Sequence, residues 1–425
     1  MAARVATKVA VIGAGYAGLA SAVELAEAGV AVEVFEASHT LGGRARAVTL
    51  DSMTVDNGAH ILVGAYRETL RLMEKVGADR TALKPLKREF LHLEFPGQVK
   101  VAAPNLPAPL HLGWALLTAR GLSFKDKIAA IRFMRAQQAR NFRLPEDLSA
   151  ADLFSAHRQP ERVRRFLWEP LCLAALNTPV ASASAQVFLN VLRDSLAADR
   201  AASDLLLPAT DFSSLFPEPA ARFIASHGGR VVRGTRIRTL AELNELGRFD
   251  HKVIAVAPYH LAALLPEIAA RFRFDWQPIA TCYLAYPGAT LLPFPMIGLD
   301  NGYAQWIFDR GALCGQPGIL AAVISGTGPW QELDHDALAA SIHAQIAALL
   351  PGLRPPLKHW VIEEKRATFA CTPSLERPPT ATGLPNVWLA GDYVAGDYPA
   401  TLEGAVRSGV AAARSILRET SGHQS

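Results

Sequence analysis

Two short apolar runs near the start of the chain, KVAVI at 8–12 and VAVEVF at 30–35, enclose a stretch with helical periodicity. The first run leads directly into a glycine-rich turn, and the second ends at Glu36. Buried parallel strands are continuous apolar runs, and a helix between two of them forms the crossover of a β-α-β unit. The pattern therefore predicts a strand, a helix and a second strand of a parallel sheet.

Three later apolar runs also predict strands. They are found in HGGRVVRGTRIRTL at 227–240, DHKVIAVAP at 250–258 and VWLAGD at 387–392. We expect the first two to belong to a smaller sheet, and the third to run into a turn. The stretch that begins at Thr401, TLEGAVRSGVAAARSIL, has the pattern of a helix. The end of the chain is therefore expected to form another strand, turn and helix.

The first glycine-rich turn reads GAGYAG and has the GxGxxG spacing of dinucleotide-binding folds. Gly13 permits the tight turn, Gly15 lets backbone N–H groups approach a pyrophosphate, and Gly18 allows the helix to pack closely on the strand. The helix N-terminus adds partial positive charge. Glu36 can accept hydrogen bonds from a ribose, and an acid at this place disfavours the 2′-phosphate of NADP. We therefore predict a dinucleotide site.

A second glycine turn, Gly42-Gly43-Arg44, follows soon after Glu36 and distinguishes FAD from NAD. It can bring backbone and a guanidinium up to a diphosphate, and it occurs in many flavoproteins but generally not in NAD dehydrogenases. Further on, Asn57 and Gly58 lie in an extended piece that can pass beside a flavin ring. These motifs predict that the dinucleotide is FAD.

The late strand, turn and helix can form the opposite wall of the same site. Gly391 and Asp392 form the turn, and Asp392 can hold the ribityl or diphosphate part of FAD. A reduced isoalloxazine is anionic around N1 and O2, so the helix start at Thr401, Leu402 and Glu403 can offer it N–H groups and a favourable dipole. The two ends of the chain are therefore expected to meet at one flavin.

We predict an α/β fold in which a Rossmann-like FAD-binding domain, on a glutathione-reductase-like plan, is interleaved with an α+β substrate domain. The FAD-binding domain is expected from residues 1–80, 226–275 and 366–425, and the substrate-binding domain from residues 81–225 and 276–365. In the middle segment of the FAD-binding domain, Ile237 is a candidate neighbour of the adenine.

Composition and charge narrow the partners of the protein. Half of the 425 residues are apolar and the net charge is only +4, with acids and bases interspersed, so nothing indicates nucleic acid. The four cysteines are far apart and have no metal-ligand spacing, so we expect no metal site and a reducing cytoplasm.

The segment 106–139 mixes large apolar residues with arginines and lysines. Such a segment can lie peripherally on the inner face of the cell membrane or be an ordinary surface helix.

Together, these motifs resemble the flavin amine oxidase and phytoene desaturase superfamily. Within it, five long blocks are similar to the squalene-associated FAD-dependent desaturases, also called hydroxysqualene dehydroxylases, of bacterial hopanoid biosynthesis. The blocks are DNGAHILVGAYRETLRLMEKVGA (56–78), LWEPLCLAALNTPVASASAQVFLNVLRDSL (167–196), AASDLLLP (201–208), EKRATFACTP (364–373) and GDYVAGDYPATLEGAVRSG (391–409). The resemblance runs nearly from end to end.

The resemblance implies that hydroxysqualene and reduced FAD give squalene, water and oxidised FAD. The hydroxyl is allylic, so proton-assisted C–O cleavage leaves a stabilised cation that can take hydride from the flavin. The enzyme must then supply an acid near the leaving oxygen and a dry apolar channel for the isoprenoid chain. The chain has only one strong dinucleotide motif, so the donor that reduces FAD stays unknown.

Four side chains in these blocks are candidates for the acid: His60, Asp194, Asp397 and Tyr398. Each can equally be structural, as a capping aspartate, a core histidine or a packed tyrosine. Asp397 lies five residues after Asp392, just before the helix that is expected to face the flavin. We therefore expect Asp397 to be the proton donor.

The channel is predicted from the density of leucine and aromatic side chains, because aromatic faces can stabilise a transient cation. Each of these residues can equally belong to the hydrophobic core. The candidates are Phe166, Leu167, Trp168, Leu171, Leu173, Leu176, Phe188, Leu192, Trp276, Phe294, Met296, Trp306 and Phe308.

Three alternatives stay open at this point. The first is desaturation of a phytoene-type carotenoid by oxidised FAD. The second is amine oxidation, but many amine oxidases place a lysine on a strand of the substrate domain, and the corresponding run PIATCYLAY at 278–286 has Thr281 there. The third is a carrier that holds an isoprenoid without catalysis.

Overall fold

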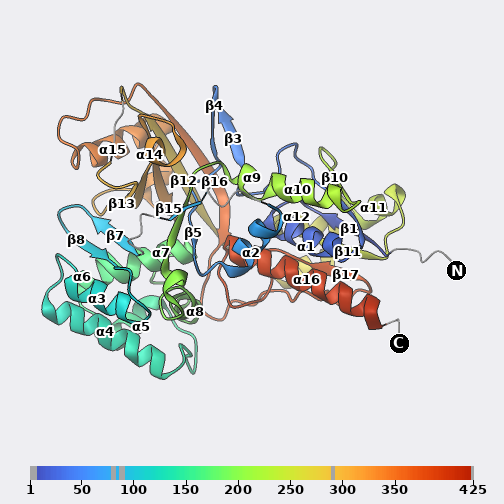
Figure 1. Cartoon of the computed structure of the whole chain (residues 1–425), viewed down its shortest axis with the longest axis horizontal. Coiled ribbons are helices and arrows are strands. Elements are labelled where there is room, and N and C mark those ends of the chain that lie inside the picture. Colours follow the sequence, from blue (N-terminus) through green and yellow to red (C-terminus); the bar gives the residue numbers. More distant parts are fainter. Residues whose placement is uncertain (1–6, 78–82, 86–90, 289–291, 423–425) are drawn as a thin grey trace.

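The computed structural model describes residues 7–77, 83–85, 91–288 and 292–422 of the chain. The predicted domain boundary between residues 80 and 81 lies outside this part. Within it, two five-stranded sheets form the framework, and helices cover them (Figure 1).

The first sheet is parallel throughout and has the strand order β10-β2-β1-β11-β17. Its strands are β1 (Lys8–Ile12), β2 (Ala31–Phe35), β10 (Arg230–Val232), β11 (His251–Ile254) and β17 (Val387–Leu389). The strand order reverses direction at the central strand β1, as in doubly wound folds. The predicted α/β class is confirmed, and the beginning, middle and end of the chain meet in one sheet.

The prediction of a separate smaller sheet for residues 227–240 and 250–258 is wrong. Strand β10 pairs with β2, and β11 pairs with β1, so both extend the same parallel sheet. Each follows a helical crossover, which returns the chain to the sheet in the same direction as β1 and β2. Val253 and Ile254 are completely buried, as expected of a strand inside such a sheet.

Three helices, α1 (Tyr16–Glu27), α10 (Pro217–Ser226) and α16 (Leu402–Gly422), pack in one hydrophobic core on this sheet. Helices α1 and α16 approach each other so closely that a Cβ on Gly409 would lie 2.1 Å from the carbonyl oxygen of Ala17. The other helices of this half are α2 (Arg67–Lys75), α9 (Phe212–Leu215), α11 (Leu240–Leu246), α12 (Pro258–Leu264) and α13 (Pro266–Arg271).

The second sheet is antiparallel and has the order β13-β14-β15-β12-β16. Its strands are β12 (Trp276–Ala285), β13 (Met296–Gly298), β14 (Trp306–Asp309), β15 (Ile319–Ser325) and β16 (Lys358–Phe369), and it is accompanied by α14 (Arg310–Cys314), a 3-10 turn (Pro329–Glu332) and α15 (His335–Ala347). It lies at the upper left of Figure 1, away from both chain termini.

A helical group at the lower left of Figure 1 completes the molecule. It contains α3 (Leu110–Thr118), α4 (Phe124–Ala139), α5 (Ala150–Ala156), α6 (Glu161–Val163), a π-helical turn (Arg164–Trp168), α7 (Glu169–Leu176) and α8 (Ala185–Ser195). Serine side chains at 123, 149 and 184 cap α4, α5 and α8 by accepting a backbone N–H of the first turn. These caps explain why the helices start where they do.

Short strands and turns connect these parts. They are the pairs β3 (Ala47–Leu50) with β4 (Met53–Asp56) and β7 (His92–Phe95) with β8 (Val99–Ala102), the three-stranded group β5 (Leu62–Val63), β9 (Leu205–Pro208) and β6 (Leu83–Pro85), and a 3-10 turn (Arg200–Ser203).

The division into domains stays a prediction. Helices α9 and α10 fall in the segment that it gives to the substrate domain, yet their apolar residues pack in the same core as α1 and α16. The antiparallel sheet and most of the helical group share a second core.

Candidate active site

A cavity of about 850 Å³ lies where the parallel strands end and α1 begins, and its walls continue onto the antiparallel sheet and onto α7 and α8. Doubly wound sheets form binding clefts at the carboxyl ends of the strands, at the point where the strand order reverses. We call the wall formed by residues 12–17, 35–46 and 235–238 the dinucleotide end. We call the wall formed by the antiparallel sheet, α7 and α8 the apolar end.

The glycines of the first turn bring backbone close to backbone. Gly13 has φ +102°, and a Cβ on it would lie 2.6 Å from the carbonyl oxygen of Ala255. A Cβ on Gly18 would lie 1.9 Å from the carbonyl oxygen of Gly13, so α1 rests directly on the end of β1. Gly13 and Gly15 line the cavity, whereas Gly18 lies behind them.

Helix α1 begins at this turn without a side-chain cap and without an acid in its first turn. The backbone N–H groups at a helix start carry partial positive charge and favour an anion. Gly15, Tyr16 and Ala17 line the cavity, so this helix start offers a phosphate site.

Glu36 lies at the end of β2 on the cavity wall, where its carboxylate is held by backbone. It accepts hydrogen bonds from the N–H of Ala14 at 2.7 Å and the N–H of Ser38 at 2.8 Å. Ile237 also lines this end and is 7% exposed. The structure therefore brings the acid and the apolar neighbour predicted for FAD to the same end as the glycine turn.

Arg44 joins the two ends of the chain across the cavity. Its guanidinium donates to Asp392 at 2.6 Å and to the carbonyl oxygen of Ala367 at 2.7 Å. Burial lowers the pKa of Arg44, but the neighbouring Asp392 raises it more, so the guanidinium stays charged. Gly43, Arg44, Gly391 and Asp392 all line the cavity. A fixed cation beside an uncapped helix start and a glycine turn fits the diphosphate of FAD.

The segment from Asn57 to His60 lines the middle of the cavity. The N–H of Ala59 donates to Thr281 Oγ1 of β12 at 3.3 Å, so the segment is held against the antiparallel sheet. Thr281 takes the strand position at which amine oxidases were expected to carry lysine. Among the described residues, no lysine lines the cavity.

His60 lines the cavity, and its Nδ1 lies 2.6 Å from the carbonyl oxygen of Gly58. That carbonyl can only accept, so Nδ1 carries the proton and Nε2 is left as an acceptor. Burial lowers the pKa of His60. The ring is therefore a neutral hydrogen-bond acceptor and a poor source of protons.

Asp194 of α8 and Tyr398 form a hydrogen-bonded pair on the cavity wall. The Tyr398 hydroxyl donates to Asp194 Oδ2 at 2.8 Å. Burial raises the pKa of Asp194, but hydrogen bonds from Arg193 and Tyr398 lower it more, so the carboxylate is ionised. Burial, and then Asp194, raises the pKa of Tyr398, while Arg407 opposes the shift. The pair therefore presents a neutral phenol that is held by a carboxylate.

Besides Gly18, two predicted site residues, Asp397 and Glu403, do not line the cavity. The Asp397 side chain is 52% exposed, and its carboxylate lies 3.4 Å from the guanidinium of Arg193, which also contacts Asp194. Glu403 is completely buried and accepts from the N–H groups of Glu68 at 3.1 Å and Thr69 at 2.9 Å, which ties α16 to α2. By contrast, Thr401 and Leu402 do line the cavity.

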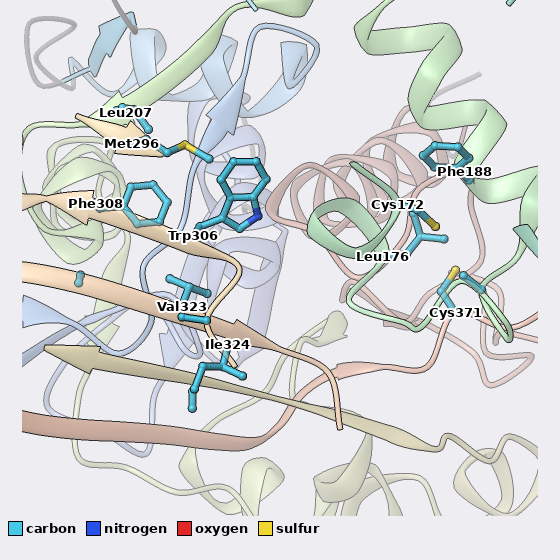
Figure 2. Close-up of a cluster of buried hydrophobic side chains, with 14 of the residues drawn as sticks. Cys172, Leu176, Phe188, Leu207, Met296, Trp306, Phe308, Val323, Ile324 and Cys371 are labelled. Atoms are coloured by element: carbon cyan, nitrogen blue, oxygen red, sulfur yellow. The ribbon is translucent and has the colours of Figure 1, made fainter. Parts of the chain in front are cut away.

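The apolar end combines one face of the antiparallel sheet with two helices. Figure 2 shows Met296, Trp306, Phe308 and Val323 on the strands and Phe188 on a helix across from them. Six of the thirteen side chains predicted for the channel line the cavity: Leu171, Phe188, Leu192, Met296, Trp306 and Phe308. The other seven, Phe166, Leu167, Trp168, Leu173, Leu176, Trp276 and Phe294, lie elsewhere.

Sequence reasoning missed the small and branched residues of this wall, among them Ala174, Ala175, Val191, Ile279 and Val323. Their only sequence signal is helical or alternating spacing relative to the larger residues. The structure adds what spacing does not show: Val323 pairs directly with Trp306, which puts both on the same face of the sheet.

Comparison with known proteins agrees with this geometry. The family model for flavin containing amine oxidoreductases matches residues 16–417. Hydroxysqualene dehydroxylase from Rhodopseudomonas palustris is 30% identical over 431 residues, which cover 96% of this chain and 97% of that protein. Zeta-carotene desaturase from Synechocystis is 26% identical over 477 residues, which cover 96% and 97%.

Among solved structures, an oxidoreductase from Methanosarcina mazei superposes with a TM-score of 0.72 and 15% identity, over 95% of this chain and 99% of that one. At this identity the likeness concerns the fold alone. The family match and the full-length relatives confirm the predicted resemblance and the predicted cofactor, FAD. The chain belongs to the flavin containing amine oxidoreductase family, is similar within it to the hydroxysqualene dehydroxylases, and is an FAD-dependent oxidoreductase.

Proposed function

We propose that the protein removes the allylic hydroxyl of hydroxysqualene and releases squalene. The C–O bond breaks, the hydroxyl leaves as water after taking a proton, and a hydride replaces it on carbon. FAD, when bound and reduced, supplies the hydride and ends oxidised. An external electron donor then reduces the FAD again. The proposal is supported by the relatives named hydroxysqualene dehydroxylase, which match over 96% of the chain.

The observation that carries the proposal is the combination of two walls in one cavity. The dinucleotide end offers backbone N–H groups and Arg44, while the apolar end offers mainly apolar side chains such as Trp306, Phe308 and Val323. Its charged lining residues are Asp194 of α8 and Glu364 of β16. A wall of this kind suits a long hydrocarbon and excludes water from a carbon that carries positive charge during C–O cleavage. Aromatic faces can stabilise such a carbon.

We propose Tyr398 as the proton donor to the leaving hydroxyl. It is a neutral phenol on the cavity wall. Its single proton points to Asp194 in this structure and must turn to the leaving oxygen when the substrate is bound. The guanidinium of Arg407 lies 4.5 Å from the centroid of the Tyr398 ring, where it would stabilise the phenolate left behind. This replaces Asp397 as the first candidate, because the Asp397 carboxylate lies outside the cavity wall.

A second candidate is desaturation of a carotenoid by oxidised FAD, favoured by the 26% identity to zeta-carotene desaturase. The two reactions run in opposite redox directions, so one experiment separates them. Holoprotein is reduced with dithionite under nitrogen and mixed with hydroxysqualene in detergent, and the product is identified by mass. We expect squalene and oxidised flavin. Unchanged hydroxysqualene, together with desaturation of phytoene by the oxidised protein, would overturn the proposal.

The role of Tyr398 as proton donor is tested with Tyr398→Phe, which keeps the aromatic ring and removes the hydroxyl that carries the proton. We expect kcat for dehydroxylation to fall about 10²–10⁴-fold, the usual contribution of a positioned acid, with flavin content unchanged. The matched control is Tyr303→Phe, since Tyr303 does not line the cavity. Equal loss in Tyr398→Phe and Tyr303→Phe, or no loss in either, would remove Tyr398 from this role while leaving the reaction itself standing.

A further inference from the structure

Helix α3 exposes an unusual number of large apolar side chains. Leu110 is 62% exposed, Trp114 53% and Leu117 56%. Their spacing of four and three residues puts them on one face of the helix. Phe124, the first residue of α4, is 71% exposed. Four of the seven large apolar residues that stand out as exposed in the described part of the chain therefore lie within 110–124.

The opposite face of α3 is fixed to the protein. His111 and Ala115 are buried, and His111 Nε2 lies 3.3 Å from Ser203 Oγ. Ser203 and its neighbour Ala202 line the cavity. One helix thus carries a stripe exposed to solvent on one side and contacts the cavity wall on the other.

Cations surround the exposed stripe. Arg120 and Lys125 are exposed, and Lys127 donates to the carbonyl oxygen of Leu117 at 2.7 Å, which holds α4 against the end of α3. Between residues 110 and 135 the bases are Arg120, Lys125, Lys127, Arg132 and Arg135, while Asp126 is the only acid. Asp126 is engaged in the capping box with Ser123.

We propose that the α3 stripe, defined as Leu110, Trp114, Leu117 and Phe124 with the cations Arg120 and Lys125, docks on an anionic lipid bilayer. The apolar side chains would enter the acyl boundary, and the cations would contact the headgroups. Figure 1 shows α3 and α4 at the edge of the molecule opposite the chain termini. In the described residues no helix is long and apolar enough to cross a bilayer, so the contact is peripheral.

Charge complementarity favours a bilayer over a second protein as the occupant. The apolar side chains are large and flanked by cations, which suits an anionic surface with an apolar interior. Docking there would bring the cavity wall next to a source of water-insoluble substrate. That consequence rests on the proposed function, whereas the docking itself does not.

The test is flotation of the FAD-loaded protein with vesicles of phosphatidylcholine containing phosphatidylglycerol, and with phosphatidylcholine alone. We expect binding to the anionic vesicles that weakens in high salt. The double variant Trp114→Gln, Leu117→Gln should reduce the partition coefficient at least tenfold. Arg120→Glu with Lys125→Glu should reduce it by at least about 25-fold on anionic vesicles only, because each cation lost costs roughly fivefold and each glutamate adds repulsion.

Matched controls lie far from the stripe. Leu357→Gln changes another leucine, 75% exposed, and Arg418→Glu reverses an exposed charge on α16. Both should bind vesicles like the parent, and all variants should keep their flavin.

Absence of flotation, or equal flotation of the stripe and control variants, would overturn the proposal. So would concentration-dependent self-association in vesicle-free buffer that the stripe variants abolish, because the stripe would then bind a second copy. Dehydroxylation in detergent is measured separately, so failure of the reaction and failure of docking are distinguishable.

Discussion

The dinucleotide end and the apolar end of the cavity differ in the kind of contact that builds them. At the dinucleotide end, backbone atoms meet backbone atoms, as where a Cβ on Gly18 would lie 1.9 Å from the carbonyl oxygen of Gly13. At the apolar end, side chains such as Trp306, Phe308 and Val323 line the cavity. Backbone contacts allow no repacking, whereas side chains around a void can shift. The two ends should therefore respond very differently to the addition of a few carbon atoms.

The largest effect is expected from Gly18→Ala. The added methyl group must push α1 away from the end of β1, because backbone at 1.9 Å cannot yield. We expect the purified protein to lose its flavin, and the free energy of unfolding to fall by about 3 kcal/mol. Flavin absorbance after gel filtration and chemical denaturation measure the two quantities.

The matched control is Gly113→Ala, which makes the same change inside helix α3. A Cβ on Gly113 meets no atom within 4 Å, so this variant should keep its flavin and be slightly more stable, by about 0.5–1 kcal/mol. If Gly18→Ala retained FAD at the parent level, the backbone account of the dinucleotide end would be wrong.

Next in size is Arg44→Ala, which removes the cation that joins the two ends of the chain. It leaves Asp392, which is 7% exposed, without its partner at 2.6 Å. Loss of one member of a buried ion pair costs about 3–5 kcal/mol, reduced here because the Arg44 side chain is 26% exposed. We expect weaker FAD binding in titrations of the apoprotein. The double variant Arg44→Ala, Asp392→Asn should regain part of the stability but not the FAD affinity.

A smaller effect is expected at Asp56, the last residue of β4, which contacts the antiparallel sheet. Its carbonyl oxygen accepts from the Tyr283 hydroxyl of β12 at 2.8 Å. Burial raises the pKa of the Asp56 carboxyl from 3.8 to about 7. Between these values the folded protein holds a proton that the unfolded chain has lost, so stability is highest at low pH and falls as the pH rises to 7.

Asp56→Asn should remove this dependence, because an amide does not titrate. The free energy of unfolding of the parent should fall by about 2–3 kcal/mol more than that of the variant between pH 5 and pH 8. Denaturant melts at both pH values measure the difference. Parallel pH profiles of parent and variant would show that Asp56 is ionised throughout.

The contrast between local backbone contacts and contacts between distant side chains also explains which parts of the fold could be predicted from the sequence. The unit β1-α1-β2 could be predicted from the sequence because its apolar runs and glycines constrain the backbone locally. The membership of β10 and β11 in the same sheet was not readable, because a three- or four-residue strand carries no information about its partner. The order of the antiparallel sheet was invisible for the same reason, since it is set by pairs such as Trp306 with Val323.

The candidate site shows the same limits. Gly13, Gly15, Glu36, Arg44 and Asp392 were predicted from short sequence motifs, and the structure gathers them around one cavity. Tyr398 and Asp397 are adjacent in a loop without periodicity, so only the structure shows which side chain faces the cavity. The alanines of α7 carry no functional group that a sequence motif could reveal. They matter because their small side chains leave part of the cavity open.

The smallest effect in free energy, and the sharpest comparison, is expected from filling that space. Ala175 of α7 is partly exposed and lines the cavity, so Ala175→Phe adds bulk at the apolar end. We expect the flavin content to be unchanged and kcat/KM for hydroxysqualene to fall about tenfold, which corresponds to 1.4 kcal/mol. Ala411→Phe, an exposed position on α16, is the matched control and should leave both unchanged. If Ala175→Phe also released the flavin, the two ends would not be separable, and the distinction between a backbone-built and a side-chain-built wall would fail.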